Sequence, residues 1–202
     1  ICALSGGVDS MALFQCLNDL GLHFYTIHFN HNYHAQSNEV AIFLNDMIDS
    51  STCQRHFSIS LNLDGVNNFE SESRVKRYSH LKNLCRRLNC DIILTAHHLD
   101  DQAETILLHL MRGSGLQGLS GIPEFRSFDP GVLARPLLTV PHHEIEAYGK
   151  KWSLRWIEDP SNNTTQHDRN YIRHKIIPPL KQRWAAAAQQ IGRSARNNAG
   201  SV

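Results

Sequence analysis

Segments that favour strands and segments that favour helices alternate along the first part of this chain. Short apolar runs predict strands, and the segments between them, where apolar residues recur at helical spacing, predict helices. The strands are expected at residues 1–4, 23–29, 55–61 and 91–95, and the helices at residues 11–20, 40–48, 74–88 and 105–111. Such alternation is typical of a parallel sheet with helices on both faces. We therefore predict an α/β protein with an open, mostly parallel sheet.

The pattern changes after residue 113. Glycines make residues 113–115 and 118–123 loop-like, and prolines interrupt the stretch that follows. Helices are predicted at residues 141–152 and 170–184, and an alanine run at 185–188 suggests an exposed helix. A small helical extension is therefore expected after the sheet.

Charge is distributed unevenly along the chain. Its 41% hydrophobic residues are enough for a packed core, and the net charge is only +1. Residues 150–202, however, hold ten basic and three acidic residues, a net of +7, whereas the rest of the chain is near −6. A basic end on an acidic body favours a surface that faces a polyanion, although a solvated basic helix would give the same count.

The cysteines and the apolar runs indicate a cytoplasmic protein. The five cysteines are scattered without a CxxC pair, which disfavours zinc ribbons and thioredoxin-like motifs and favours reduced, buried thiols. The sequence shows no apolar run long enough to span a bilayer and no signal peptide before the first apolar segment. We therefore expect no membrane partner.

Residues 5–10 read Ser-Gly-Gly-Val-Asp-Ser and stand between the first predicted strand and the first predicted helix. Ligands of open α/β sheets bind at the carboxyl ends of the strands. Paired glycines let the backbone approach an anion, the helix N-terminus directs N–H groups at it, and Ser5 and Ser10 add hydroxyls. Asp9 would repel phosphate without a metal ion between them, which favours Mg²⁺. A glycine turn with a helix cap is the alternative.

Residues 95–105 read Thr-Ala-His-His-Leu-Asp-Asp-Gln-Ala-Glu-Thr, at the end of a predicted strand and the start of a helix. Asp101 and Glu104 are three residues apart and so share a helical face, where two carboxylates could hold an ammonium group or a metal. The alternative is a capping box, in which acids near the N-terminus stabilise the helix. The histidines lack the HExxH spacing, so zinc is not expected.

The motifs resemble those of a known family. Residues 5–10 match the SGGxDS signature of the PP-loop ATP pyrophosphatase superfamily, whose adenine nucleotide alpha hydrolase-like fold we therefore expect. The pattern of one branch, the tRNA(Ile)-lysidine synthases, is resembled at residues 98–105, 112–119, 135–138, 156–162 and 169–173. Residues 73–78 resemble that family's ARxxRY segment, with Ser73 in place of the usual alanine.

The resemblance implies a two-step reaction. ATP adenylates the C2 oxygen of the wobble cytidine in tRNA(Ile) with a CAU anticodon and releases pyrophosphate, and the amine of free L-lysine then displaces AMP. ATP and Mg²⁺ are the implied cofactors. The implied residues are Ser5, Gly6, Gly7, Asp9, Ser10 and His28 for ATP, with Asp9 also for Mg²⁺, Asp101 and Glu104 for lysine, and Arg77 and Arg169 for phosphates or the cytidine. Without the resemblance, these arginines could be helix-surface ion pairs.

The resemblance also predicts the domain bounds, and the sequence differs from the family pattern in two places. Residues 1–184 are expected to form the catalytic domain, with a core of about 1–120 and an extension of about 121–184. Residues 185–202 are a helical tail or the start of a C-terminal tRNA-binding region, of which this chain has almost none. A truncated chain and a short form both stay open, as does a homodimer. Residues 31–34, His-Asn-Tyr-His, replace the family's His-Gly-Leu-Arg-like stretch.

Three alternatives remain. A PP-loop tRNA thiolase would need paired catalytic cysteines or an iron–sulfur cluster, which the scattered cysteines disfavour. A small-molecule amidotransferase synthetase would need a glutaminase nucleophile arrangement, and none is visible. A nucleotide-binding module without turnover is disfavoured because Asp9, Asp101 and Glu104 are all present.

Overall fold

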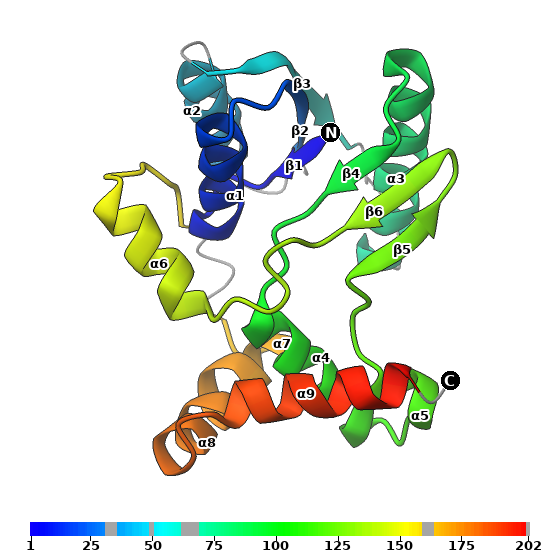
Figure 1. Cartoon of the computed structure of the whole chain (residues 1–202), viewed down its shortest axis with the longest axis vertical. Coiled ribbons are helices and arrows are strands. Elements are labelled where there is room, and N and C mark those ends of the chain that lie inside the picture. The colour runs from blue at the N-terminus through cyan, green and yellow to red at the C-terminus, as the bar shows by residue number, and fades with distance from the viewer. Residues whose placement is uncertain (31–35, 49–50, 62–68, 159–163, 201–202) are drawn as a thin grey trace. The chain divides into compact units, whose positions relative to one another are not determined.

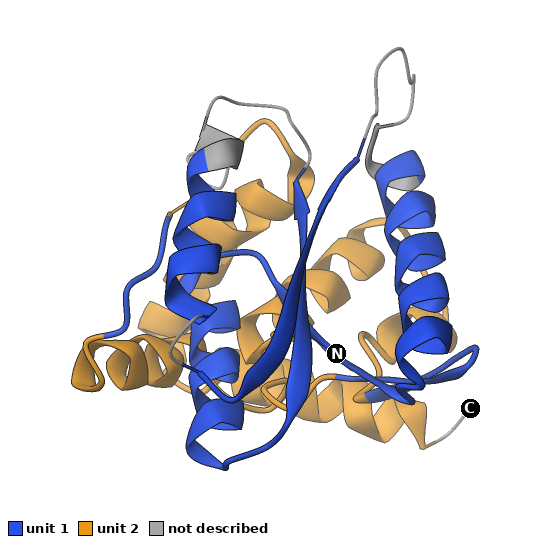
Figure 2. Cartoon of the chain, turned by 90° about the horizontal axis from the view of Figure 1, so that it is seen from above, with its two compact units in different colours: residues 1–95, 125–134, 154–157 blue, residues 96–124, 135–153, 158–202 orange. Residues whose placement is uncertain are grey.

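The structure is a computed structural model of the 202-residue chain. It describes residues 1–30, 36–48, 51–61, 69–158 and 164–200; the family departure at residues 31–34 and the segment 159–162 lie outside the described residues. Two compact units are formed (Figure 2). The first comprises residues 1–95, 125–134 and 154–157, and the second residues 96–124, 135–153 and 158–202.

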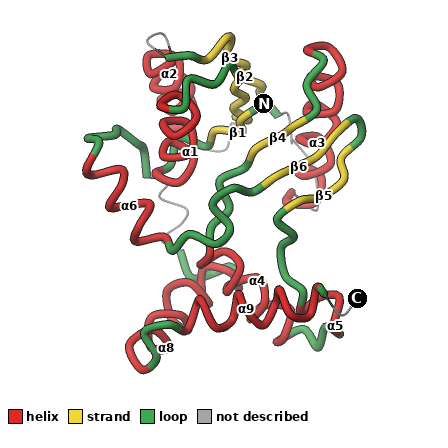
Figure 3. Tube along the Cα trace, viewed as in Figure 1, coloured by secondary structure: helices red, strands yellow, loops and turns green. Residues whose placement is uncertain are grey.

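The first unit is built on a six-stranded sheet (Figures 1 and 3). The strands are β1 (Cys2–Leu4), β2 (Phe24–Asn30), β3 (Cys53–Ser60), β4 (Ile92–Leu94), β5 (Phe125–Phe128) and β6 (Gly131–Ala134). Their order is β3-β2-β1-β4-β6-β5, and every pairing is parallel except that of β5 with β6. The helices are α1 (Val8–Asp19), α2 (Gln36–Ile48) and α3 (Phe69–Leu88). This arrangement confirms the predicted α/β class and the mostly parallel sheet.

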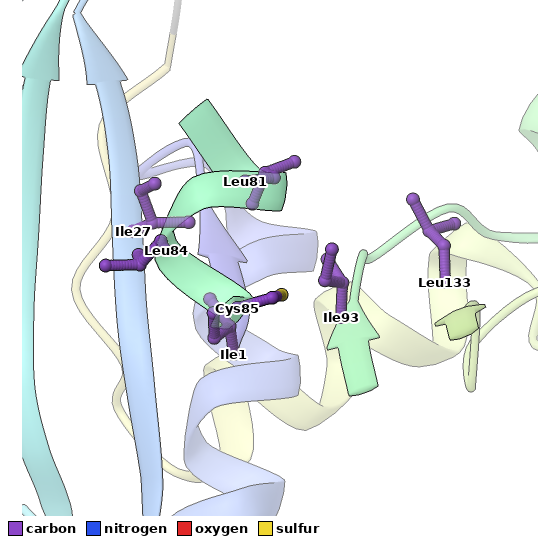
Figure 4. Packing of buried hydrophobic residues seen from close by; sticks show 7 residues of the cluster. All are labelled: Ile1, Ile27, Leu81, Leu84, Cys85, Ile93 and Leu133. Atoms are coloured by element: carbon purple, nitrogen blue, oxygen red, sulfur yellow. The ribbon is translucent and has the colours of Figure 1, made fainter. Parts of the chain in front are cut away.

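Strand alternation sends two sets of side chains to opposite faces of the sheet. Ile27 on β2 and Ile93 on β4 are fully buried against α3, which contributes Leu81 and Leu84 (Figure 4). On the other face, Phe24 packs edge-on against Phe14 of α1, with ring centroids 5.6 Å apart. Helices therefore cover both faces, as the alternating pattern predicted.

The strand order places a topological switch point at β1. From β1 the chain moves outward through β2 to β3, and then returns to the other side of β1 as β4. In open α/β sheets the crevice at such a point, outside the carboxyl ends of the strands, binds ligands. The loop that leaves β1 begins at Ser5, so the fold presents the glycine motif where a ligand is expected.

The β5–β6 hairpin was not predicted from the sequence, because each of its strands has only four residues and lies in a proline- and glycine-rich stretch. The hairpin extends the sheet through β6, which pairs with β4. Gly131 is required at this junction, since a Cβ atom there would lie 1.9 Å from the carbonyl oxygen of Asp91. Lys82 and Arg86 of α3 form ion pairs with Asp129 in the turn.

The second unit is helical. Its elements are α4 (Leu99–Met111), α5 (Leu116–Leu119), α6 (His142–Lys151), α7 (Asp168–Tyr171), a π-helical turn (Ile172–Ile176), α8 (Ile177–Arg183) and α9 (Ala187–Ala199). Helix α5 was not predicted and overlaps the loop expected at residues 118–123. Helix α4 begins six residues before the segment predicted as helical, because an N-terminal cap extends it. The predicted helix at 170–184 is present but is interrupted by the π-helical turn.

Small residues allow α9 to pack closely against α4. Ala195 of α9 and Ala103 of α4 are fully buried, and a Cβ atom on Gly192 would lie 2.9 Å from Leu99. Such close packing leaves little room for larger side chains. Within the described part of the chain, no helix combines the length and the apolar character that crossing a membrane requires.

Candidate functional site

The loop after β1 is organised around the hydroxyl group of Ser10. Its Oγ accepts hydrogen bonds from the backbone N–H groups of Ser5 and Gly6, at 3.2 Å each, and donates one to the Gly7 carbonyl at 2.9 Å. The Ser5 hydroxyl lies 3.1 Å from the same oxygen. Ser10 is buried and therefore holds the loop in shape, whereas Ser5 is exposed and has its hydroxyl near the surface.

The first turn of α1 supplies the groups that an anion and its metal ion would need. Gly7 is the N-cap residue and no side chain caps the helix, so the helix N-terminus is open to an anion. Asp9 lies in the first turn, and its carboxylate oxygens are the ligand type that Mg²⁺ prefers. The residues present therefore fit a phosphate group with Mg²⁺. Ile157 fixes the loop from the side by donating its N–H to the Gly6 carbonyl at 2.9 Å.

Gly6→Ala is expected to destabilise this loop. Gly6 has φ +88°, which side chains of L-residues rarely adopt, and a Cβ atom there would lie 2.7 Å from Cγ1 of Val40. We expect the free energy of unfolding to fall by about 2 kcal/mol or more. Gly7→Ala is the matched control: φ is −78° and a Cβ atom would meet only the Ser5 Oγ at 3.6 Å. Urea denaturation without nucleotide checks both variants, and equal losses would contradict the prediction.

His28 lies on β2 beside the end of β1. The register pairs it with Leu4, whose carbonyl oxygen is 3.0 Å from His28 Nδ1. A carbonyl can only accept, so Nδ1 donates and a neutral ring leaves Nε2 as an acceptor. Burial lowers the pKa of His28, which keeps the ring neutral at pH 7. Nε2 is buried and has no hydrogen-bond partner among the described residues.

Buried histidines make the stability of the chain depend on pH. Burial and the neighbouring His28 lower the pKa of His56 from 6.5 to about 4. Burial is also the largest cause of the lowered pKa of His97, about 4, which nearby arginines lower further while Asp101 opposes the shift. The unfolded chain binds these protons near pH 6.5 and the folded chain only near pH 4. The free energy of unfolding is therefore expected to fall as the pH is lowered through this window.

Urea denaturation between pH 7.5 and 4.5 measures this slope. His56→Gln removes one of the titrating groups and should make the slope shallower. An unchanged slope in this variant would show that His56 does not titrate with a lowered pKa.

Helix α4 begins at a capping box formed by His98 and Asp101. His98 Nδ1 accepts hydrogen bonds from the N–H groups of Asp100 and Asp101, and the Asp101 carboxylate accepts one from the His98 N–H at 3.0 Å. A capping box was the alternative interpretation of Asp101 and Glu104, but it lies one turn earlier than that pair. Burial raises the pKa of Asp101, but the contacts with His98 outweigh it and the net shift is downward, so Asp101 is ionised.

The other carboxylate, Glu104, is held by two arginines. Arg169 Nε lies 3.0 Å from Glu104 Oε2, and Arg173 donates through Nε to Oε1 at 2.6 Å and through Nη2 to Oε2 at 2.9 Å. Only 1% of the Glu104 side chain is exposed. Arg173 Nη2 also lies 3.3 Å from Asp101 Oδ1, so both carboxylates share one helical face, as their spacing predicted.

Asp100, the first acid of the motif, joins three helices of the second unit. Its Oδ1 lies 2.5 Å from Lys181 Nζ on α8, and its Oδ2 accepts a hydrogen bond from the His142 N–H at the start of α6. Asp100 is buried, so these bonds satisfy a charge that would otherwise be costly. Asp100 thus serves helix packing, whereas Asp101 belongs to the cluster around Glu104.

The structure places the predicted site residues in two groups. Ser5, Gly6, Gly7, Asp9, Ser10 and His28 lie together at the carboxyl ends of β1 and β2 in the first unit, and Asp101, Glu104 and Arg169 lie together in the second. Arg77 lies half-buried on α3 of the first unit. Sequence reasoning missed the contact made by Arg173, although its position four residues after Arg169 puts both on one helical face.

Comparisons with known proteins agree with this architecture. Two curated tRNA(Ile)-lysidine synthases are similar to the chain: that of Alkalilimnicola ehrlichii is 37% identical over 202 residues, and that of Vibrio parahaemolyticus is 40% identical over 205. These matches cover 98% and 96% of this chain but 45% of each relative. The chain thus spans less than half the length of these relatives.

A solved structure shares the fold. The U34-tRNA thiolase of Methanococcus maripaludis, solved with its 4Fe-4S cluster, has a TM-score of 0.81 and 18% identity, with 97% of this chain and 70% of that chain covered. Residues 1–180 also match the sequence profile of the PP-loop domain. Together with the glycine motif at the switch point of the sheet, this match shows that the chain belongs to the PP-loop domain family.

Proposed function

We propose that this chain is the catalytic part of a tRNA(Ile)-lysidine synthase, a ligase that forms a carbon–nitrogen bond. The observation that carries the proposal is the similarity to lysidine synthases over nearly all of this chain. It is supported by a glycine loop that leads into an uncapped helix in the first unit and by a cluster of carboxylates and arginines in the second. The site in the first unit would bind ATP, as PP-loop chemistry requires. The site in the second unit would bind a small charged substrate.

In the proposed first step, ATP adenylates the C2 oxygen of the wobble cytidine of tRNA(Ile) with a CAU anticodon, and pyrophosphate is released. The N–H groups in the first turn of α1, which no side chain caps, bind the phosphates, and Ser5 adds a hydroxyl. His28, which lies beside Leu4 at the end of β1, belongs to the same nucleotide site. When bound through Asp9, Mg²⁺ offsets the phosphate charge.

In the proposed second step, free L-lysine displaces AMP. Asp101 and Glu104 serve lysine binding, Asp101 by contact and Glu104 through the arginines that it holds. Arg77 on α3 and Arg169 on α7 are the candidates for anionic groups of the substrates. Adenylation makes the step feasible because AMP leaves far more readily than an oxygen atom of the base.

A PP-loop tRNA thiolase is the second candidate, and the likeness of fold to the U34-tRNA thiolase favours it. The thiols of this chain argue against it, because thiol chemistry requires the thiolate. Cys2 and Cys85 are buried, and burial raises the pKa of Cys2 to about 12. Cys53 is engaged with the hydroxyl of Thr26, 3.4 Å away.

Incorporation of radiolabelled lysine tests the proposal. A full-length protein that contains this chain is incubated with ATP, Mg²⁺ and unmodified tRNA(Ile) bearing a CAU anticodon. Lysine label in the tRNA that depends on ATP is the expected result. ATP turnover stimulated by tRNA without lysine label would replace the proposal with the thiolase, and no exchange of ATP with pyrophosphate would indicate a binding module.

A further inference from the structure

Residues 154–157, which we call the strap, belong to the first unit, although α6 before them belongs to the second (Figure 2). At the end of the strap, Ile157 donates its N–H to the Gly6 carbonyl at 2.9 Å. Gly6 is buried, so an unpaired carbonyl at this position would be costly. The strap therefore contacts the loop after β1 through its backbone and satisfies a buried acceptor there.

The bond from Ile157 orients the peptide group that joins Gly6 to Gly7. A peptide group is planar and trans, so a carbonyl that is held on one side fixes the N–H on the other. That N–H belongs to Gly7, the N-cap residue of α1, and its nitrogen lies 3.4 Å from the Ser5 hydroxyl oxygen. The bond thus sets both the Ser5 hydroxyl and the start of the uncapped first turn of α1, the groups that would bind a phosphate.

Helix α2 anchors the strap beside the loop. Val40, Phe43 and Met47 stand at positions i, i+3 and i+7 and so share one stripe of this helix. The Arg155 guanidinium lies over the Phe43 ring, 5.8 Å from its centroid, and its Nη2 lies 3.2 Å from Met47 Sδ. At the other end of the stripe, a Cβ atom on Gly6 would lie only 2.7 Å from Val40 Cγ1. One stripe of α2 therefore holds both the strap and the loop.

We propose that Arg155 is a positioning residue for the phosphates of ATP. Its contacts with α2 keep the Ile157 N–H on the Gly6 carbonyl, and this bond keeps the Ser5 hydroxyl and the first turn of α1 in their binding orientation. Ile157 follows Arg155 by two residues and so stays within about 7 Å of it along the backbone. The inference rests on the proposed function, because it takes the loop after β1 as the phosphate site.

Isothermal titration of the full-length protein tests the inference, with inorganic pyrophosphate, ATP and adenosine as separate ligands in the presence of Mg²⁺. An exposed cation–π contact is worth a factor of about two to five in an equilibrium constant. Arg155→Ala should therefore weaken pyrophosphate and ATP binding by about two- to fivefold and leave adenosine binding unchanged. Arg155→Lys keeps a cation near Phe43 and should recover part of the affinity. A role in stability alone would change none of these affinities, since they are measured on the folded protein.

Two variants of Ile157 separate its backbone donor from its side chain. Ile157→Pro removes the N–H and leaves the Gly6 carbonyl without this bond, which should weaken pyrophosphate binding by about fivefold or more. Ile157→Ala keeps the N–H and should change the affinity by less than about twofold. Equal losses in the two variants would assign the effect to the side chain and overturn the inference. If Ile157→Pro does not fold, Arg155→Ala decides the question.

The matched control is Arg126→Ala, because Arg126 on β5 makes the same kind of contact in the same unit, 5.5 Å from the Tyr78 ring centroid. It should leave pyrophosphate affinity unchanged. Unchanged pyrophosphate affinity in Arg155→Ala would overturn the inference, and so would an equal loss in Arg126→Ala. A loss of adenosine affinity as large as that of pyrophosphate would also overturn it, since the effect would then not be confined to the phosphates. A protein that shows the expected loss in Arg155→Ala but puts no lysine into tRNA would keep the inference and overturn the proposed function.

Discussion

Asp9→Asn is expected to abolish ATP-dependent adenylation while the protein stays folded. The variant keeps the size of the side chain and removes its charge, so the proposed Mg²⁺ ligand in the first turn of α1 is lost, and with it the ion that would offset the phosphate charge. Loss of one electrostatic group of this kind lowers turnover by about 10²–10³-fold, and loss of the metal should exceed that. The helix dipole loses only about 0.3–1 kcal/mol of favourable interaction. Exchange of ATP with labelled pyrophosphate, measured in the full-length protein with tRNA, provides the readout.

Asp19→Asn is the matched control for this experiment. Asp19 ends the same helix, where its carboxylate accepts a hydrogen bond from Gln15 at 2.7 Å on the surface. Its replacement should leave exchange within about twofold, since the loop is at the other end of α1. Exchange that survives in Asp9→Asn at an unchanged Mg²⁺ requirement would show that the metal is held by other groups.

The part of the fold that the sequence predicted is the part with local signals. The first strand and helix could be assigned because apolar spacing and the glycine motif agree over residues 1–20. The β5–β6 hairpin has no comparable signal. Phe125 is 65% exposed and the strands have four residues each, so only the pairing of β6 with β4 and of β5 with β6 makes them strands. The apolar–polar periodicity of a four-residue segment does not reveal such pairing with a strand elsewhere in the chain.

The candidate site shows the same division. Spacing alone predicted that Asp101 and Glu104 share a helical face, and both contact Arg173. What spacing did not indicate is that Glu104 is already saturated, because the arginines come from a segment about 65 residues further along the chain. The roles of His98 as the helix cap and of Asp100 as a link to α6 and α8 were also missed, since each depends on a distant or backbone partner.

Glu104→Gln is expected to cost the chain about 1–3 kcal/mol of unfolding free energy, because a buried acceptor is lost while the arginines it held are 41% and 33% exposed. The variant leaves Arg169 and Arg173 beside a neutral side chain that is buried. Urea denaturation measures the loss. Asp168→Asn removes a carboxylate from an exposed pair with Arg112 in the same unit, and should change the unfolding free energy by less than about 1 kcal/mol. Equal, small losses in both variants would show that the arginines find other partners.

A double-mutant cycle separates the charge of Glu104 from its packing. Because Arg173 donates two hydrogen bonds to Glu104, Arg173→Met should recover part of the stability that Glu104→Gln loses, with a coupling energy of about 1 kcal/mol or more. If Glu104 orients Arg169 for a substrate, lysine affinity should stay low in the double variant even where stability returns. Recovery of stability and lysine affinity together would instead mean that Glu104 serves the fold alone.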